Sequence, residues 1–131
     1  MNKILFLLAL VTLIGCGFPG VSDGPSQSSH QPSAGCNQDV KVHYRNNCGK
    51  NLIVFFIEVN PGTPAICESL ERMGSILVNQ RREFTIHKGK TAFFVFAEDE
   101  EGKCNGGHRK SEAWVNCEQA SSSEASFDVC H

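Results

Sequence analysis

Cysteines offer the most chemistry in this sequence, because a thiol can form a disulfide, hold zinc, carry a covalent group or act as a nucleophile. The chain has 131 residues and seven cysteines: Cys16, Cys36, Cys48, Cys67, Cys104, Cys117 and Cys130. No Cys-x-x-Cys or His-x-x-x-His spacing occurs, so the sequence predicts no metal site. An odd count in an exported chain indicates that one cysteine has a different role.

Six of these cysteines are the disulfide candidates: Cys36, Cys48, Cys67, Cys104, Cys117 and Cys130. Six cysteines allow fifteen pairings, and the sequence does not choose among them. The one pairing that we predict is Cys104–Cys117, which would clamp a hairpin around Gly106-Gly107. Three disulfides would require an oxidising compartment outside the cytoplasm.

The seventh cysteine, Cys16, follows an apolar run from Ile4 to Ile14. A run of about eleven residues is typical of a signal peptide, because a membrane span needs about twenty. The sequence Leu13-Ile14-Gly15-Cys16 resembles the lipobox of bacterial lipoproteins. The resemblance implies cleavage before Cys16 and attachment of a diacylglycerol, with fatty acyl chains such as palmitate, to its thiol.

The position of the anchored chain follows from the same resemblance. Gly17, where an Asp would favour retention in the inner membrane, implies the outer membrane or the periplasm-facing side if the host has two membranes. The alternative is ordinary secretion with cleavage after Gly17, since Gly15 and Gly17 satisfy a small-x-small rule. Either cleavage leaves six cysteines for disulfides.

Other candidate sites have simpler interpretations. His43 and His87 occupy polar positions of predicted strands, so we expect them to face solvent. The carboxylates of Glu98–Glu101 with Asn105 are ligands that calcium prefers, but their spacing fits no EF-hand and indicates a solvated acidic loop. No Gly-x-Ser-x-Gly elbow is present, and we expect no enzyme and no cofactor.

The single tryptophan, Trp114, is the possible contact for a partner. Strand alternation separates it from Ala113 and Val115, which share the opposite face. An outward Trp114 would be an anchor for a protein or glycan. Core packing is the alternative, because central strands of a sandwich are buried on both faces.

Three segments follow from composition. Residues 1–15 form the signal peptide, and residues 16–35 form the lipidated cysteine with a Ser-, Gly- and Pro-rich tether that buries too little apolar surface to fold. Residues 36–131 form one disulfide-braced domain. Seven short strands are predicted in it: Val40–Arg45, Leu52–Val59, Ser75–Asn79, Glu83–His87, Thr91–Ala97, Ser111–Glu118 and Ala125–Cys130.

These strands predict an all-β fold, an antiparallel sandwich or partly open barrel. Leu52–Val59 (LIVFFIEV) is a run of mostly β-branched and aromatic residues, so we expect it to be central and covered on both faces. Glu83–His87 and Thr91–Ala97 are predicted to pair as a hairpin through Lys88-Gly89-Lys90, and Ala65–Arg72 permits one or two helical turns. The segment FFVFAEDEEGKCNGGH, Phe93–His108, is similar to a motif in small exported bacterial β domains of unknown function.

Charge bounds the choice of partner. Twelve Lys and Arg residues against fourteen Asp and Glu give a net charge of −2, and loss of Lys3 with the signal peptide makes it more negative. This balance argues against nucleic acid, which needs a basic face. We therefore expect an envelope-anchored binding module with a protein or glycan partner. A freely secreted protein or inhibitor is the alternative, and a hydrolase is a weaker one.

Overall fold

The structure is a computed structural model that describes residues 26–117 and 123–130. These residues form eight strands and three short 3-10 helices. The strands are β1 (Ser26–Ser28), β2 (Val40–Asn46), β3 (Leu52–Val59), β4 (Glu71–Ile76), β5 (Arg81–Ile86), β6 (Thr91–Ala97), β7 (Arg109–Asn116) and β8 (Glu124–Val129). The 3-10 helices are η1 (Cys67–Ser69), η2 (Glu100–Lys103) and η3 (Gly106–His108). The predicted all-β class is confirmed.

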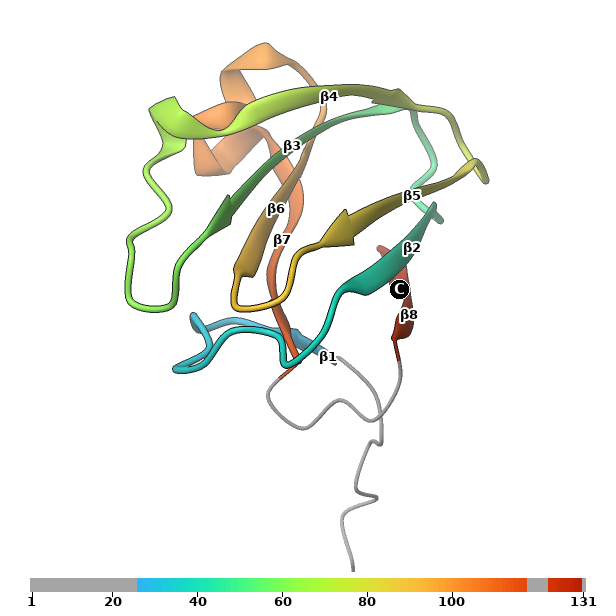
Figure 1. Cartoon of the computed structure of the whole chain (residues 1–131). Helices are drawn as coiled ribbons and strands as arrows, with labels where there is room; N and C mark the ends of the chain where they lie inside the picture. Colours follow the sequence, from blue (N-terminus) through green and yellow to red (C-terminus); the bar gives the residue numbers. More distant parts are fainter. Residues whose placement is uncertain (1–25, 118–122, 131) are drawn as a thin grey trace, which may run out of the picture.

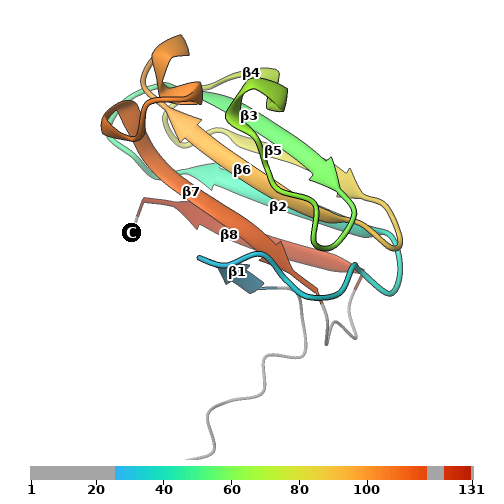
Figure 2. The same cartoon turned by 90° about the vertical axis from the view of Figure 1, so that its left-hand side faces the viewer.

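The strands form two sheets that lie face to face (Figures 1 and 2). The five-stranded sheet has the order β1-β7-β6-β3-β4, and the three-stranded sheet has the order β5-β2-β8. The sheets do not close on each other, so the fold is a sandwich and the barrel alternative is wrong. Pairing is antiparallel except between β2 and β8, which run parallel.

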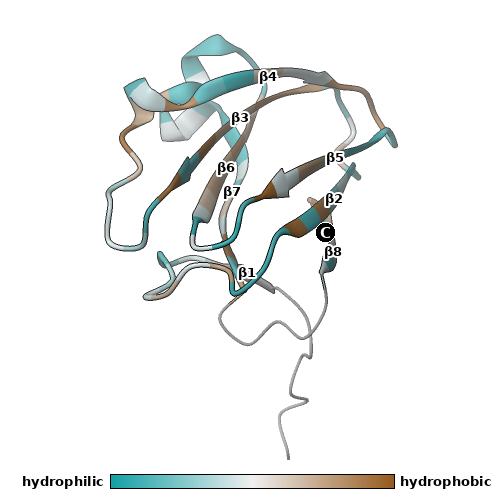
Figure 3. Ribbon diagram, viewed as in Figure 1, coloured by the Kyte–Doolittle hydropathy of each residue, from teal (hydrophilic) through white to brown (hydrophobic). Residues whose placement is uncertain are grey.

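The core between the sheets is built from alternating side chains. Val40, Val42 and Tyr44 of β2 are at most 4% exposed, while Lys41 and Arg45 face solvent. Hydrophobic residues are concentrated on the central strands, and the connection that carries η2 and η3 is hydrophilic (Figure 3). The alternation of buried and exposed residues in β2 is the two-residue period from which this strand was predicted.

The outer face of the five-stranded sheet carries a second, smaller core. Phe55 of β3 is 1% exposed and packs with Leu70, Val95 and Ala97. Leu70 lies between η1 and β4, so this connection folds back over β3 and β6. The prediction that Leu52–Val59 is a central strand with both faces covered is confirmed.

The predicted hairpin through Lys88-Gly89-Lys90 is wrong. Strand β5 lies in the three-stranded sheet and β6 in the five-stranded sheet, so the turn carries the chain from one sheet to the other. Gly89 has a φ of 82°, in the left-handed region that favours glycine. A glycine turn alone did not distinguish a hairpin from a crossover between layers.

The boundaries around β4 also differ from the prediction. The strand expected at Ser75–Asn79 is β4, which begins at Glu71 and ends at Ile76. Its start takes up the end of Ala65–Arg72, where only η1 forms a helical turn. The bulge opposite Val54 and Phe55, next to Gly74, interrupts the two-residue period that sequence patterns rely on.

The folded domain begins before its predicted start at Cys36. Strand β1 pairs with β7, and Pro32 is buried. A Cβ at Gly35 would lie 2.3 Å from the carbonyl of Gly89, so this part of the predicted tether packs closely on the domain. Residues 16–25 lie outside the described residues. Among those described, no helix has the length and apolar character needed to cross a bilayer.

Candidate functional site

All six disulfide candidates form disulfides, as predicted. The pairs are Cys36–Cys117, Cys48–Cys130 and Cys67–Cys104. The predicted Cys104–Cys117 pair is wrong, because strand β7 separates these two residues. Its eight residues span roughly 25 Å at about 3.3 Å each, far beyond the reach of a disulfide. Cys16 lies outside the described residues.

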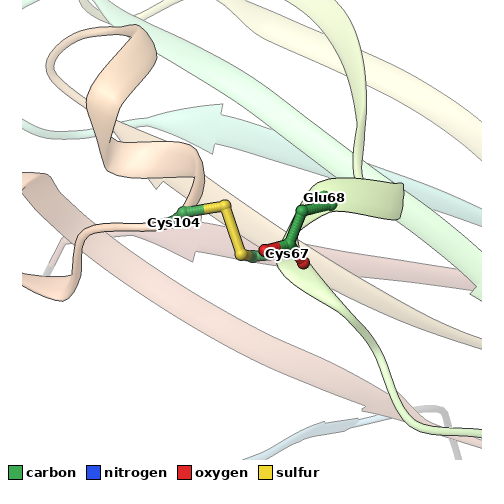
Figure 4. Close-up of side chains that lie close together, drawn as sticks. All are labelled: Cys67, Glu68 and Cys104. Atoms are coloured by element: carbon green, nitrogen blue, oxygen red, sulfur yellow. A yellow bond between two sulfur atoms is a disulfide. The ribbon is translucent and has the colours of Figure 1, made fainter.

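Cys67, Glu68 and Cys104 bring three potential metal-binding side chains together outside the five-stranded sheet (Figure 4). Both sulfur atoms belong to the same disulfide, so neither is a thiolate that could bind a metal. The disulfide instead joins η1 to the chain that follows η2. It therefore holds the covering connection of the outer core against the loop after β6.

The acidic loop after β6 is shaped by its own polar side chains. One oxygen of Asp99 accepts from the Gly102 amide at 3.2 Å and caps η2, while the other lies 2.7 Å from Nδ1 of His108. The side chain of Asn105 accepts from the Gly107 amide and caps η3. The side-chain oxygen of Asn105 is therefore used to cap the turn, and not as a calcium ligand beside the carboxylates.

His108 lies between two carboxylates of this loop. Its Nε2 is 3.6 Å from Glu101, and the ligand atoms of Asp99, Glu101 and His108 all lie within 4.8 Å of one another. The hydrogen bond with Asp99 raises the pKa of His108 and lowers the pKa of Asp99. The pair is charged in mildly acidic solution and fastens the two ends of the loop.

Glu98 and Arg109 attach the loop to the sheet. Hydrogen bonds from Lys110 and Lys50 lower the pKa of Glu98, with nitrogen atoms 2.6 and 3.0 Å from its carboxylate. Arg109 donates to the carbonyls of Gly102 and Lys103. The charges that suggested a solvated acidic loop are mostly engaged in these local contacts.

Trp114 is not the exposed contact that an outward side chain would provide. It is 8% exposed, and its ring lies 5.0 Å from that of Phe93 across the β6–β7 pair. Both rings lie on the outer face of the five-stranded sheet, beside the backbone of β1. Of the two interpretations of Trp114, the structure favours packing.

The remaining predicted histidines pair with glutamates. His87 is exposed, and its amide and ring nitrogen contact the carboxylate of Glu58 at 2.8 and 3.0 Å. His43 faces outward on β2 but is half-buried, 3.5 Å from Glu83 on β5. The expected solvent exposure is therefore found for His87, but His43 is only partly exposed.

The outer face of the three-stranded sheet is polar, and most of its side chains are exposed in the part of the chain that the structure describes. Its outward residues come from alternate positions of the three strands: Lys41, His43, Arg45, Arg81, Glu83, Thr85, Glu124, Ser126 and Asp128. A depression of about 280 Å³ on this face is lined by Arg45, Arg81, Ser126, Phe127 and Asp128. Sequence reasoning missed this site, because its residues meet only when β5 and β8 are placed on either side of β2.

Comparisons with known proteins supply no relative. No protein-family model, curated protein or solved structure matches the chain. The candidate sites are therefore judged by their geometry and chemistry alone.

Proposed function

We propose that this chain is a lipid-anchored exported protein whose sandwich is a binding module at the cell envelope, without enzymatic activity. The observation that carries the proposal is the use of the cysteines. All six cysteines after residue 16 are consumed in three disulfides. Cys16, at the end of the lipobox-like sequence, is the one cysteine left for another role.

The disulfides support the location. Three disulfides indicate an oxidising compartment, since thiols in the cytoplasm are kept reduced. Two of them close segments of 81 and 82 residues, which constrains the unfolded chain strongly. A domain braced in this way suits an environment without the chaperones and reductants of the cytoplasm.

The exposed surface supports a binding role. The three-stranded sheet presents an exposed polar face on a rigid support, and its depression combines charged and hydroxyl groups. Rigid strands hold such groups in place with little loss of entropy when a partner binds. The contact for the partner is thus proposed on this face and no longer at Trp114.

The anchor is tested by the intact mass of protein extracted from membranes of a bacterial host. We expect a mature chain that starts at Cys16 and carries added acyl mass, and we expect Cys16→Ser to abolish that mass. A chain without acyl mass that starts near Phe18 would contradict the anchor and favour free secretion. Membrane fractionation of both forms provides the matching localisation.

A further inference from the structure

The depression on the three-stranded sheet centres on two arginines that stand side by side. Arg45 of β2 lies directly opposite Arg81 of β5, and its other neighbour is Asp128 of β8. Like charges at directly opposed positions of a sheet repel each other. This arrangement therefore favours the binding of a negative charge close to both guanidinium groups.

The described carboxylates supply only part of that compensation. Arg45 lies 3.5 Å from the carboxylate of Asp128, with both side chains about half exposed. Arg81 donates to the Ser126 hydroxyl at 3.4 Å, and no carboxylate of residues 26–117 or 123–130 lies within ion-pair distance of it. Among the described lining residues, two positive charges and one negative charge leave the depression with one positive charge in excess.

The other lining groups select what kind of anion fits. The Asp128 carboxylate can accept hydrogen bonds from ligand hydroxyl groups, and the Ser126 hydroxyl can accept from them or donate to them. A bare inorganic anion has no such hydroxyl groups. The volume of about 280 Å³ lies near the lower limit of small-ligand pockets, about 300–1,000 Å³, and so suits one ring-sized unit.

We infer that this depression binds a sugar unit that carries a carboxylate, such as a uronic acid of an acidic glycan. Arg45 and Arg81 bind the carboxylate, because guanidinium groups match its planar geometry. Ser126 and Asp128 bind ring hydroxyls. The inference rests on the proposed binding role at the envelope and names the chemistry of the partner.

The test is a titration of the purified full chain, in an uncharged detergent without sugar groups, followed by NMR amide shifts. Sodium glucuronate is the probe, with glucose as the neutral sugar and sodium sulfate as the bare anion at equal ionic strength. We expect saturable shifts at Arg45, Arg81 and Ser126 with glucuronate, and at least about tenfold weaker binding of glucose and sulfate. Arg81→Gln should weaken glucuronate binding by about tenfold or more.

Lys88→Gln is the matched control, since it removes one exposed positive charge just beyond the other end of β5. It should leave glucuronate binding unchanged, and the thermal midpoints of both variants should match that of the parent chain. The inference is overturned if glucuronate gives no saturation up to about 50 mM, far above millimolar dissociation constants. Equal losses in both variants, or sulfate binding as tight as glucuronate binding, would also overturn it.

This outcome is separable from the fate of the anchor. The titration measures binding wherever the chain resides, and the mass experiment measures lipidation whatever the chain binds. A lipidated chain that does not bind glucuronate would contradict only the proposed sugar site. An unlipidated chain that binds glucuronate through Arg81 would contradict only the proposed lipid anchor.

Discussion

Asn46 is a completely buried polar residue where β2 ends. Its side chain accepts from the Cys48 amide at 2.9 Å and donates to the carbonyls of Lys50 and Ile76 at 2.9 and 3.1 Å. One amide thus joins the turn after β2 to the last residue of β4 in the other sheet. A hydrophobic residue of the same size could fill the space but would leave these backbone groups without partners.

We predict that Asn46→Ala lowers the free energy of unfolding by about 2–5 kcal/mol, because it leaves up to three buried backbone groups unsatisfied at about 1–3 kcal/mol each before relaxation. Urea unfolding measures the change. Asn47→Ala is the control, since Asn47 is exposed and should change stability by less than about 0.5 kcal/mol. Equal effects of the two substitutions would show that the buried amide adds nothing.

At the scale of elements, the loop from Glu98 to Arg109 is a unit held by one disulfide, two side-chain caps and an imidazole–carboxylate pair. Gly102 is buried inside it, and a Cβ there would lie 2.3 Å from Cβ of Ala97. The loop is therefore packed against the end of β6. Its acidic residues shape the connection and also give it its charge.

The pair of His108 and Asp99 makes this loop sensitive to pH. The pKa of His108 is raised above 6.5 by the hydrogen bond with Asp99, so its contribution to stability is complete below about pH 6.5 and is lost as pH rises through the raised pKa. The pKa of Asp99 is lowered below 3.8, so its contribution is lost only as pH falls through that lowered value. The pair is strongest between these limits.

NMR titration of the His108 ring protons tests this assignment. Asp99→Asn should move the pKa of His108 back toward 6.5, because the carboxylate that favours the charged ring is gone. Glu58→Gln, which alters the partner of His87, should leave the pKa of His108 where it was. If the pKa of His108 is unchanged in Asp99→Asn, a group other than Asp99 stabilises the charged ring.

At the scale of the whole molecule, the disulfides differ in which parts of the fold they join. Cys36–Cys117 joins the chain before β2 to the end of β7 and so links the two sheets, while Cys67–Cys104 joins connections outside one sheet. Their sequence separations are 81 and 37 residues. The longer loop removes more entropy from the unfolded chain.

We therefore predict that replacing Cys36 and Cys117 by Ala costs more stability than replacing Cys67 and Cys104. Chain entropy gives about 4.5 kcal/mol for the first pair and about 3.8 kcal/mol for the second. Urea unfolding without reductant measures both, and mass analysis of unreduced digests checks that the other pairs stay intact. A larger loss from the Cys67–Cys104 pair would show that local packing outweighs loop length.

Local patterns determined most of the secondary structure. The alternation in β2 and the apolar runs of β3 and β6 predicted strands correctly, because the side-chain period of a strand is a property of neighbouring residues. The pairing of six cysteines in three disulfides followed from their number. The cysteine at position 16 was singled out by its short local motif.

Only the tertiary structure decided which of these pieces meet. A turn at Gly89 has the same residues whether it closes a hairpin or crosses between sheets, so the sequence could not assign β5 to the other layer. The row of Arg81, Arg45 and Asp128 depends on that assignment, and the disulfide partners and the burial of Trp114 depend on the strand order and on the connections between strands. Contacts between distant residues arise from strand order, and strand order is set by the packing of the whole core.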